Sequence, residues 1–149
     1  MGASMTVVAS PLDNAMARVG DRWTLQVVEA LLEGPRRFSE LQQSVPAVAT
    51  NVLSARLRRL EADGLVVAFP YSSRPPRYSY RLTDAGAALA GAVVLLTGWG
   101  AGLSGSGAGH TGTDAAAPSH AVCGTGLEPR WYCPTCARTA EPGDELVWL

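Results

Sequence analysis

The spacing of apolar side chains predicts two amphipathic helices at the start of the chain. Ser10 can cap the first helix, which begins at Pro11 and ends at Gly20. Its predicted apolar face consists of Leu12, Ala15, Met16 and Val19. Asp21 can cap a second helix, which Gly34-Pro35 closes. Its two adjacent apolar rows, which predict burial in a core, are Trp23, Val27 and Leu31 beside Val28 and Leu32.

A helix-turn-helix is predicted next. Phe38 and Leu41 mark a short third helix, and Ser44–Ala47 is a turn into a fourth helix over Ala49 to Asp63. The leucines of the fourth helix recur at one-face spacing, and they are Leu53, Leu57 and Leu60. The polar and basic side chains fall away from this stripe and are free to meet solvent or a polyanion.

Two short strand patterns follow, over Leu65 to Tyr71 and Arg77 to Leu82. Alternation with period two places Arg77, Ser79 and Arg81 on one face of the second strand. Pro70 and Pro75-Pro76 forbid extra ladder bonds, so the hairpin should be stiff and projecting. A DNA-reading helix followed by a projecting hairpin predicts an α+β fold of the winged helix-turn-helix class.

The remaining pattern completes the expected domain organisation. Thr83 and Asp84 begin a fifth helix, whose predicted face is Leu89, Val93, Leu96 and Trp99. We expect a disordered N-terminus over 1–9, a winged helix-turn-helix domain with dimerisation helices over 10–103, a flexible linker over 104–119 and a small zinc ribbon over 120–149.

Charge is concentrated in the predicted DNA-reading region. The chain has 149 residues and a formal net charge of -1, yet the stretch from Arg36 to Arg81 has eight arginines against Glu40, Glu61 and Asp63. All basic residues are arginine, which fits a GC-rich bacterial coding bias and weakens an argument from arginine content alone. The local surplus still favours a polyanionic partner.

The expected location is cytoplasmic, because the first residues lack the positive region and cleavage pattern of a signal peptide. Residues 85–103 carry no charge and approach the length of a membrane span. Much of this stretch is Ala and Gly, which drive insertion weakly, so a buried packing helix is preferred over a membrane helix.

The tail contains a metal-ligand pattern. His120 and Cys123 are separated by two residues, and so are Cys133 and Cys136. Two such pairs match the two knuckles of a zinc ribbon, and one imidazole with three thiolates makes a closed, structural Zn²⁺ site. Trp131, Tyr132, Val147 and Trp148 are predicted to cover these knuckles.

Two alternatives for the tail stay open. The Cys133 and Cys136 spacing also serves dithiol exchange, although the surrounding sequence lacks the strand and helix pattern of a thioredoxin. A zinc ribbon can also act as a protein-interaction module.

No nucleophile triad, phosphate loop or carboxylate pair occurs in a catalytic context, so the sequence predicts a protein that is not an enzyme.

Several motifs, in order, carry a family resemblance: Gly20–Leu25, Gly34–Leu41, Leu53–Glu61, Asp63–Val66, Pro76–Gly86 and Trp99. Over residues 10–103 the chain resembles the HxlR family of bacterial winged-helix regulators. The resemblance implies a homodimer, formed through the terminal helices, that binds double-stranded operator DNA and controls transcription. A small-molecule effector at the dimer interface is left open, because no residue identifies one.

Two positions depart from the family pattern. Many members begin this domain with a Cys-Pro pair whose thiol senses oxidants or electrophiles, whereas this chain has Ser10-Pro11 and cannot sense by that thiol. The family often has a serine where the fourth helix starts, whereas this chain has Ala49, which lacks a capping oxygen. We therefore expect Thr50 to cap this helix.

The candidate DNA contacts are Arg36, Arg37, Thr50, Asn51, Ser54, Arg58, Arg74 and Arg77. Short polar side chains near the start of an inserted helix suit base edges, which favours Thr50, Asn51 and Ser54, whereas Arg58 suits a phosphate. Arg74 at the hairpin tip can enter a minor groove or bind phosphate.

Four other arginines are treated separately. Arg36 and Arg37 precede the third helix, near where a backbone phosphate should pass. Arg77 can contact DNA or pair with Glu61, and both options stay open. Arg56 is left out of the candidate set, because it can tie helices together internally.

Overall fold

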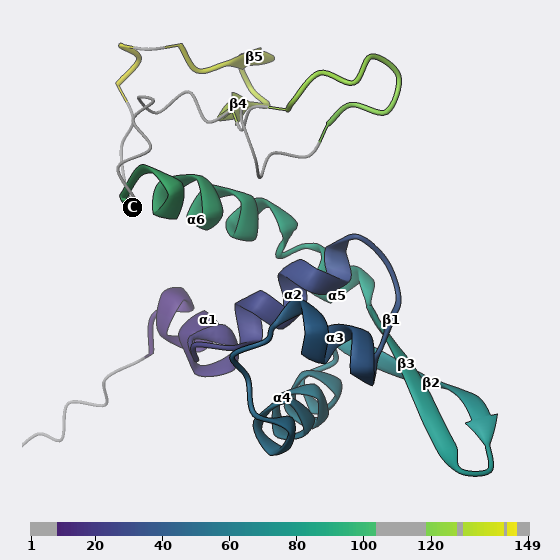
Figure 1. The fold of residues 1–149 in the computed structure, drawn as a ribbon. Helices are drawn as coiled ribbons and strands as arrows, with labels where there is room; N and C mark the ends of the chain where they lie inside the picture. The colour runs from purple at the N-terminus through teal and green to yellow at the C-terminus, as the bar shows by residue number, and fades with distance from the viewer. Residues whose placement is uncertain (1–8, 104–118, 128–129, 142, 146–149) are drawn as a thin grey trace, which may run out of the picture. The chain divides into compact units, whose positions relative to one another are not determined.

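Figure 1 shows the computed structural model of the chain, which describes residues 9–103, 119–127, 130–141 and 143–145. The chain divides into two compact units, Met1–Val93 and Val94–Leu149. The predicted N-terminal segment over 1–9 and the predicted linker over 104–119 lie almost wholly outside the described residues.

The first helix, α1 (Pro11–Val19), has the predicted cap but not the predicted burial. Ser10 Oγ accepts from the Asp13 amide at 3.0 Å, and the Asp13 carboxylate accepts from the Ser10 amide at 2.9 Å. This reciprocal capping box sets the helix start. Of the predicted apolar face, only Val19 is buried, whereas Leu12 and Met16 are exposed by 69% and 54%.

The second helix, α2 (Thr24–Leu32), has Trp23 as its N-cap residue, and the carboxylate expected to cap it belongs to Asp21, two residues earlier. Asp21 Oδ1 accepts from the amides of Trp23 at 3.0 Å and Thr24 at 3.1 Å. Burial acts to raise the pKa of Asp21, but the hydrogen bonds it accepts and the charge of Arg56 outweigh burial and hold it below its ordinary value. Asp21 therefore stays ionised at neutral pH, which suits a helix N-terminus.

The helix-turn-helix is formed by α3 (Phe38–Ser44) and α4 (Thr50–Ala62). Leu53, Leu57 and Leu60 of α4 are buried, as predicted. The expected cap is wrong: Ala49 is the N-cap residue without a side-chain hydrogen bond, and Thr50 is the first helical residue. The helix starts nonetheless, because packing of its leucine stripe compensates for a missing cap.

The sheet contains the predicted hairpin and one strand that the sequence did not indicate. Strands β2 (Val66–Ser73) and β3 (Pro76–Leu82) pair antiparallel, with a register shift around Tyr71. The additional strand, β1 (Arg36–Arg37), pairs with Tyr80 and Ser79, which gives the order β1-β3-β2. A strand of two residues has no readable periodicity, so only tertiary pairing reveals it.

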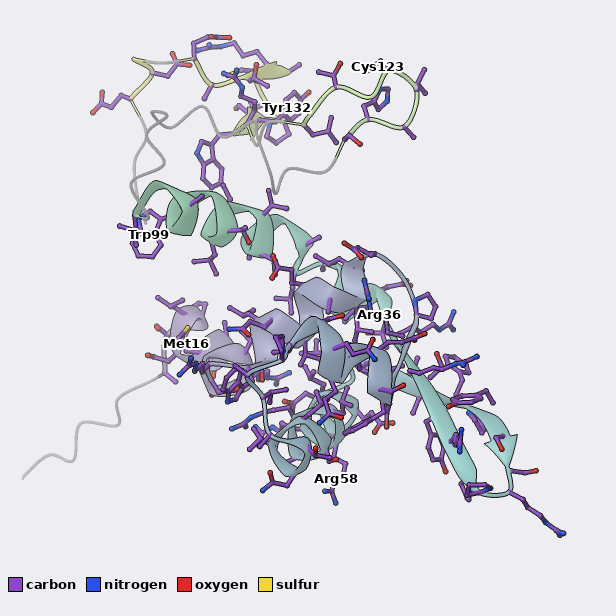
Figure 2. All side chains as sticks on the ribbon, in the orientation of Figure 1. Met16, Arg36, Arg58, Trp99, Cys123 and Tyr132 are labelled. Carbon is purple, nitrogen blue, oxygen red and sulfur yellow. The ribbon has the colours of Figure 1, made fainter. Side chains whose placement is uncertain are left out.

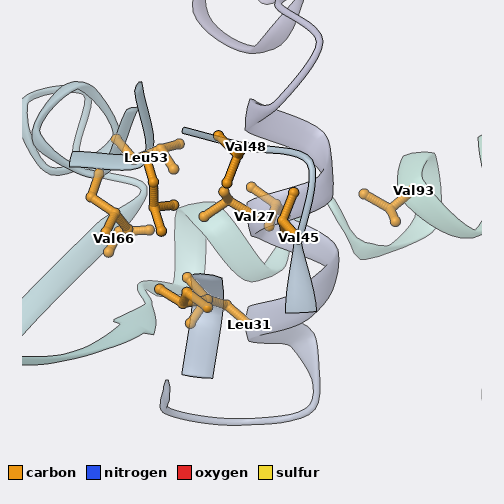
Figure 3. Packing of buried hydrophobic residues seen from close by; sticks show 11 residues of the cluster. Val27, Leu31, Val45, Val48, Leu53, Val66 and Val93 are labelled. Atoms are coloured by element: carbon orange, nitrogen blue, oxygen red, sulfur yellow. The ribbon is translucent and has the colours of Figure 1, made fainter. Parts of the chain in front are cut away.

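One hydrophobic core holds the first unit together, and Figure 3 shows its packing. It unites α2, α3 and α4 with the base of the sheet and the start of the last helix. Its buried members are Val27, Val28, Leu31, Leu41, Val45, Val48, Leu53, Leu57, Leu60, Val66 and Val93. Close packing of these side chains fixes α4 and the hairpin base in the same rigid body.

The predicted fifth helix is two helices, α5 (Asp84–Ala87) and α6 (Ala90–Leu103). Thr83 caps α5, as expected, by accepting from the Gly86 amide. A Cβ on Gly86 would lie 2.1 Å from the Leu65 carbonyl oxygen, so only glycine allows this approach to the sheet. Docking of α5 against Leu65 explains why the helix does not continue straight.

The break between α5 and α6 also bears on whether this apolar segment could span a membrane. Residues Asp84–Ala101 are long and apolar enough to cross a membrane by length and composition, with a mean hydropathy of 1.3. However, α6 alone has 14 residues and extends about 21 Å, which is shorter than a hydrocarbon core of about 30 Å.

The described part of the tail contains one small sheet. Strands β4 (Tyr132–Cys133) and β5 (Arg138–Thr139) pair antiparallel, and an isolated bridge joins Ser119 to Gly126. Arg138 donates from Nη1 to Asp144 Oδ2 at 2.9 Å next to this sheet.

Candidate nucleic-acid interface and tail ligand pairs

The exposed face at the start of α4 carries the predicted base-reading side chains. Asn51 is exposed, and Thr50 Oγ1 accepts from Gln42 Nε2 at 2.6 Å. Ser54 Oγ donates to the Thr50 carbonyl at 2.9 Å, which leaves its hydroxyl able only to accept from a base. Asn51 therefore has the largest free hydrogen-bonding capacity of the three.

Gln42 is a site residue that the sequence reasoning missed. It is half-buried in α3 and fixes the Thr50 hydroxyl across the helix-turn-helix. A glutamine next to a predicted turn gives no signal by itself, because its partner is set by the crossing of two helices.

Arg58 extends from the exposed side of α4, and Figure 2 shows it pointing away from the helical core. Its Nε donates to the Ser54 carbonyl at 3.3 Å. This bond orients the side chain and leaves both terminal nitrogens available for a phosphate, as predicted from its position.

Arg36 does not suit the predicted DNA contact. Its Nε donates to the Ala30 carbonyl at 2.7 Å, Nη1 donates to Ser44 Oγ at 3.1 Å, and Nη2 pairs with Glu33. Three of its five N–H groups are used within the protein, so Arg36 acts as a brace between α2, β1 and α3. The next residue, Arg37, is exposed instead.

Two arginines lie over aromatic rings of the hairpin. The guanidinium carbon of Arg37 is 4.7 Å from the centroid of the Tyr71 ring, and that of Arg81 is 4.5 Å from the Phe69 ring. Stacking restricts each guanidinium while its in-plane N–H groups stay accessible. Arg81 was not among the predicted contacts.

The tip of the hairpin carries arginine side chains and no acidic residue. Arg74 and Arg77 are exposed, and their side chains have no hydrogen bond or ion pair to any described residue. The alternative pairing of Arg77 with Glu61 is therefore absent from the described part of the chain. Arg56, by contrast, lies within the fold, with Nε 3.1 Å from Asp21 Oδ1 although not aligned for a hydrogen bond.

Comparison with known proteins identifies the family of this chain. The model of the HxlR-like helix-turn-helix family matches residues 18–106. The chain belongs to the HxlR family. The uncharacterised HTH-type transcriptional regulator Rv3095 of Mycobacterium tuberculosis is 37% identical over 136 residues, which cover 87% of this chain and 83% of that protein. HxlR-family membership makes this protein a DNA-binding transcriptional regulator rather than an enzyme.

Solved structures agree with the family assignment. The HTH-type transcriptional regulator YtcD has a TM-score of 0.59 and 32% identity, over 63% of this chain and 96% of that chain. The redox regulator HypR in its reduced form has a TM-score of 0.60 and 30% identity, over 64% of this chain and 95% of that chain. Both matches support the winged-helix architecture.

The tail of this HxlR-family protein forms two separate ligand pairs. His120 Nδ1 lies 3.4 Å from Cys123 Sγ, and the Cys136 amide donates to Cys133 Sγ at 3.4 Å. Gly124 adopts a φ of 71°, which allows a tight turn directly after the first pair. In the described ranges, no three His, Cys, Asp or Glu side chains are grouped so that they could hold one metal ion.

The thiols of the tail differ in acidity. The pKa of Cys123 is lowered to about 7, first by hydrogen bonds with Thr125 and then by His120. The amide of Cys136 lowers the pKa of Cys133, whereas the neighbouring Cys133 raises the pKa of the Cys136 thiol. Trp131 and Tyr132 are exposed by 62% and 60%, so they do not cover the pairs as predicted, and the other two predicted covering residues lie outside the described ranges.

The different environments of two arginines yield a prediction about stability. Arg36→Gln should lower the free energy of unfolding by about 1–2 kcal/mol, because it breaks the Arg36 hydrogen bonds to α2 and α3. Arg77→Gln is the matched control and should leave stability unchanged, since Arg77 has no partner among the described residues. Urea denaturation of both variants measures the difference, and equal stability loss would contradict the brace role.

Proposed function

We propose that this protein is a homodimeric regulator that binds a specific operator through α4 and the β2–β3 hairpin. The observation that carries the proposal is the exposed polar start of α4 next to a sheet without any acidic residue. Strands β1, β2 and β3 contain four arginines and no Asp or Glu. Such a cationic surface is complementary to the phosphate backbone.

The proposed contacts have different roles. Asn51 reads a base edge, with the Thr50 hydroxyl beside it as a donor and the Ser54 hydroxyl as an acceptor. Arg58, Arg37 and Arg77 bind backbone phosphates, and Arg74 enters the minor groove or binds a phosphate at the tip. Arg36 is removed from the proposed set because its guanidinium is engaged within the fold.

The DNA roles predict two kinds of loss. An operator is first selected from genomic fragments. Asn51→Ala should then weaken the free energy of binding to this operator by about 1–3 kcal/mol and change binding to random duplex little. Arg74→Ala should weaken binding to the operator and to random duplex alike. It should also lower the slope of log affinity against log salt concentration, the salt slope, by about one. Fluorescence anisotropy over a range of salt concentrations measures both effects.

Arg36→Gln, corrected for its folded fraction, is the control in this assay and should leave the salt slope unchanged. Equal affinity of the wild-type chain for all duplexes would overturn the proposed function. Loss of sequence preference in Arg74→Ala alone would overturn the division of roles.

The terminal helices supply the proposed dimer surface. Helix α6 has no charged residue and exposes Leu95, Leu96, Trp99 and Leu103 by 45% to 69%. On α1, Leu12 and Met16 are exposed, as Figure 2 illustrates for Met16 and Trp99. Monomeric soluble proteins rarely expose apolar patches larger than a few hundred Å². A second copy of the chain covers these faces, and the two helix-turn-helix units then read half-sites about 10 base pairs apart or a multiple of that.

The dimer predicts a mass twice the 15.6 kDa of one chain. Leu96→Glu should convert it to a monomer, because it places a charge in the proposed apolar interface. Light scattering after gel filtration measures the mass. Val122→Glu, at a tail residue exposed by 87%, is the control and should remain dimeric. A monomeric wild-type protein would reject the proposed dimer.

The tail is proposed to hold one structural Zn²⁺ through His120, Cys123, Cys133 and Cys136. Zn–N and Zn–S bonds in a tetrahedral site place nitrogen and sulfur about 3.6 Å apart. The 3.4 Å separation of His120 Nδ1 and Cys123 Sγ fits this edge. The amide bonded to Cys133 Sγ is the support that a metal-bound thiolate usually has. Metal binding would draw the two pairs together.

The zinc proposal predicts about one Zn per protomer. Cys136→Ser should lose the metal and expose the tail to protease, while the winged-helix part stays folded. Elemental analysis and limited proteolysis measure these outcomes. Thr135→Ser, a change beside the ligand that keeps all four, is the control. A metal-free protein with a reducible Cys133–Cys136 disulfide and dithiol exchange activity would favour the redox alternative.

Redox sensing through the winged-helix domain is not proposed, although HypR is a redox regulator. All three cysteines of the chain lie in the tail, and Ser10 uses its hydroxyl in the α1 capping box. A regulator of this kind acts in the cytoplasm, where thiols stay reduced and available to zinc.

A further inference from the structure

A cavity of about 370 Å³ lies between the start of α3 and the hairpin, within the first unit. Its lining consists of Phe38, Ser39, Tyr71, Pro76, Arg77, Tyr78 and Tyr80. Strand β1 pairs with β3 only at Ser79 and Tyr80, so the edge of β3 toward its start is left open on that side. The volume lies in the range of small-molecule sites, roughly 300–1,000 Å³.

The cavity combines aromatic walls with one free cation. Four of its seven lining residues are aromatic, and none is acidic. The side chain of Arg77 has no hydrogen bond or ion pair to any described residue. Aromatic walls select a planar apolar body, and a guanidinium binds a carboxylate through two parallel N–H donors.

Two of the tyrosines that line the cavity have environments that restrict them. The guanidinium carbon of Arg37 lies 4.7 Å from the centroid of the Tyr71 ring and restricts its movement. Burial, with a smaller contribution from the Glu61 charge, raises the pKa of Tyr80, so its hydroxyl stays protonated and able to donate. Glu61 does not line the cavity, and the opposite charge of Arg58 acts against it at Tyr80.

We propose that this cavity binds a planar aromatic carboxylate, with the ring against Tyr71 and Tyr78 and the carboxylate on Arg77. The consequence for regulation rests on the function proposed above. Arg77 is there a phosphate contact, so a ligand that neutralises it competes with DNA. Binding of the ligand and binding of the operator are then negatively coupled, by the same factor in both directions.

The binding test uses the full-length protein and two nearly isosteric probes, 4-hydroxybenzoate and its neutral amide, 4-hydroxybenzamide. Tyrosine ring signals in NMR titrations should saturate with the acid at a Kd on the order of 1 mM or below, as suits a ligand of this size. The amide should bind about tenfold more weakly, because it lacks the charge that Arg77 recognises. No saturation with the acid up to about 10 mM, or equal binding of acid and amide, would overturn the proposal.

Matched arginine variants assign the carboxylate contact. Arg77→Gln should weaken binding of the acid about tenfold and leave the amide nearly unchanged. Arg81→Gln removes the same charge from the same strand, but Arg81 lies on Phe69 and does not line the cavity, so acid binding should stay within about twofold. Tyr78→Ala should weaken both probes, because it removes a wall. Equal losses in the two arginine variants would overturn the assignment to this cavity.

The coupling to DNA is tested separately. Saturating 4-hydroxybenzoate should weaken operator binding and lower the salt slope by about one, and Arg77→Gln should abolish this effect. A ligand that binds without changing operator affinity would overturn the competition. If the wild-type chain showed no sequence preference for DNA, the proposed function would fail, whereas the NMR titrations would still decide the cavity proposal.

Discussion

The carboxylate of Asp21 connects the start of α2 with α4. It accepts from the amides of Trp23 and Thr24 at the start of α2, and it also lies 3.1 Å from Nε of Arg56 in α4. One ionised side chain thus fixes the start of the central helix and anchors the helix that is proposed to enter the major groove. The leucine stripe of α4 supplies the packing energy, and the ion pair adds a polar contact between α4 and the start of α2.

The arginines of the winged-helix part illustrate how one residue type serves different purposes. Arg36 braces helices, and Arg56 pairs with the capping carboxylate. Arg37 and Arg81 lie on aromatic rings, whereas Arg77 is free beside the aromatic cavity. Arg36, Arg37, Arg77 and Arg81 lie on the paired strands β1 and β3, whereas Arg56 lies on α4, so the element that carries each arginine decides which partners it can reach.

The two compact units have different sources of order. The first has a core of eleven buried apolar residues, which suffices for a small domain. The described part of the tail has two strands of two residues and exposed aromatic side chains. A segment with so little burial would gain stability from a bound metal, which is a physical argument for the Zn²⁺ site proposed above.

The sequence alone determined the elements whose signals are local. Periodicity located the core helices and the hairpin, and the capping box of Ser10 and Asp13 marked the start of α1. Tertiary structure decided what depends on distant partners: the pairing of β1 with β3, the break between α5 and α6, and the inward turn of Arg36. Two adjacent arginines have the same local signal, but strand pairing turns Arg36 toward the helices and leaves Arg37 exposed, since neighbouring side chains of a strand face opposite ways.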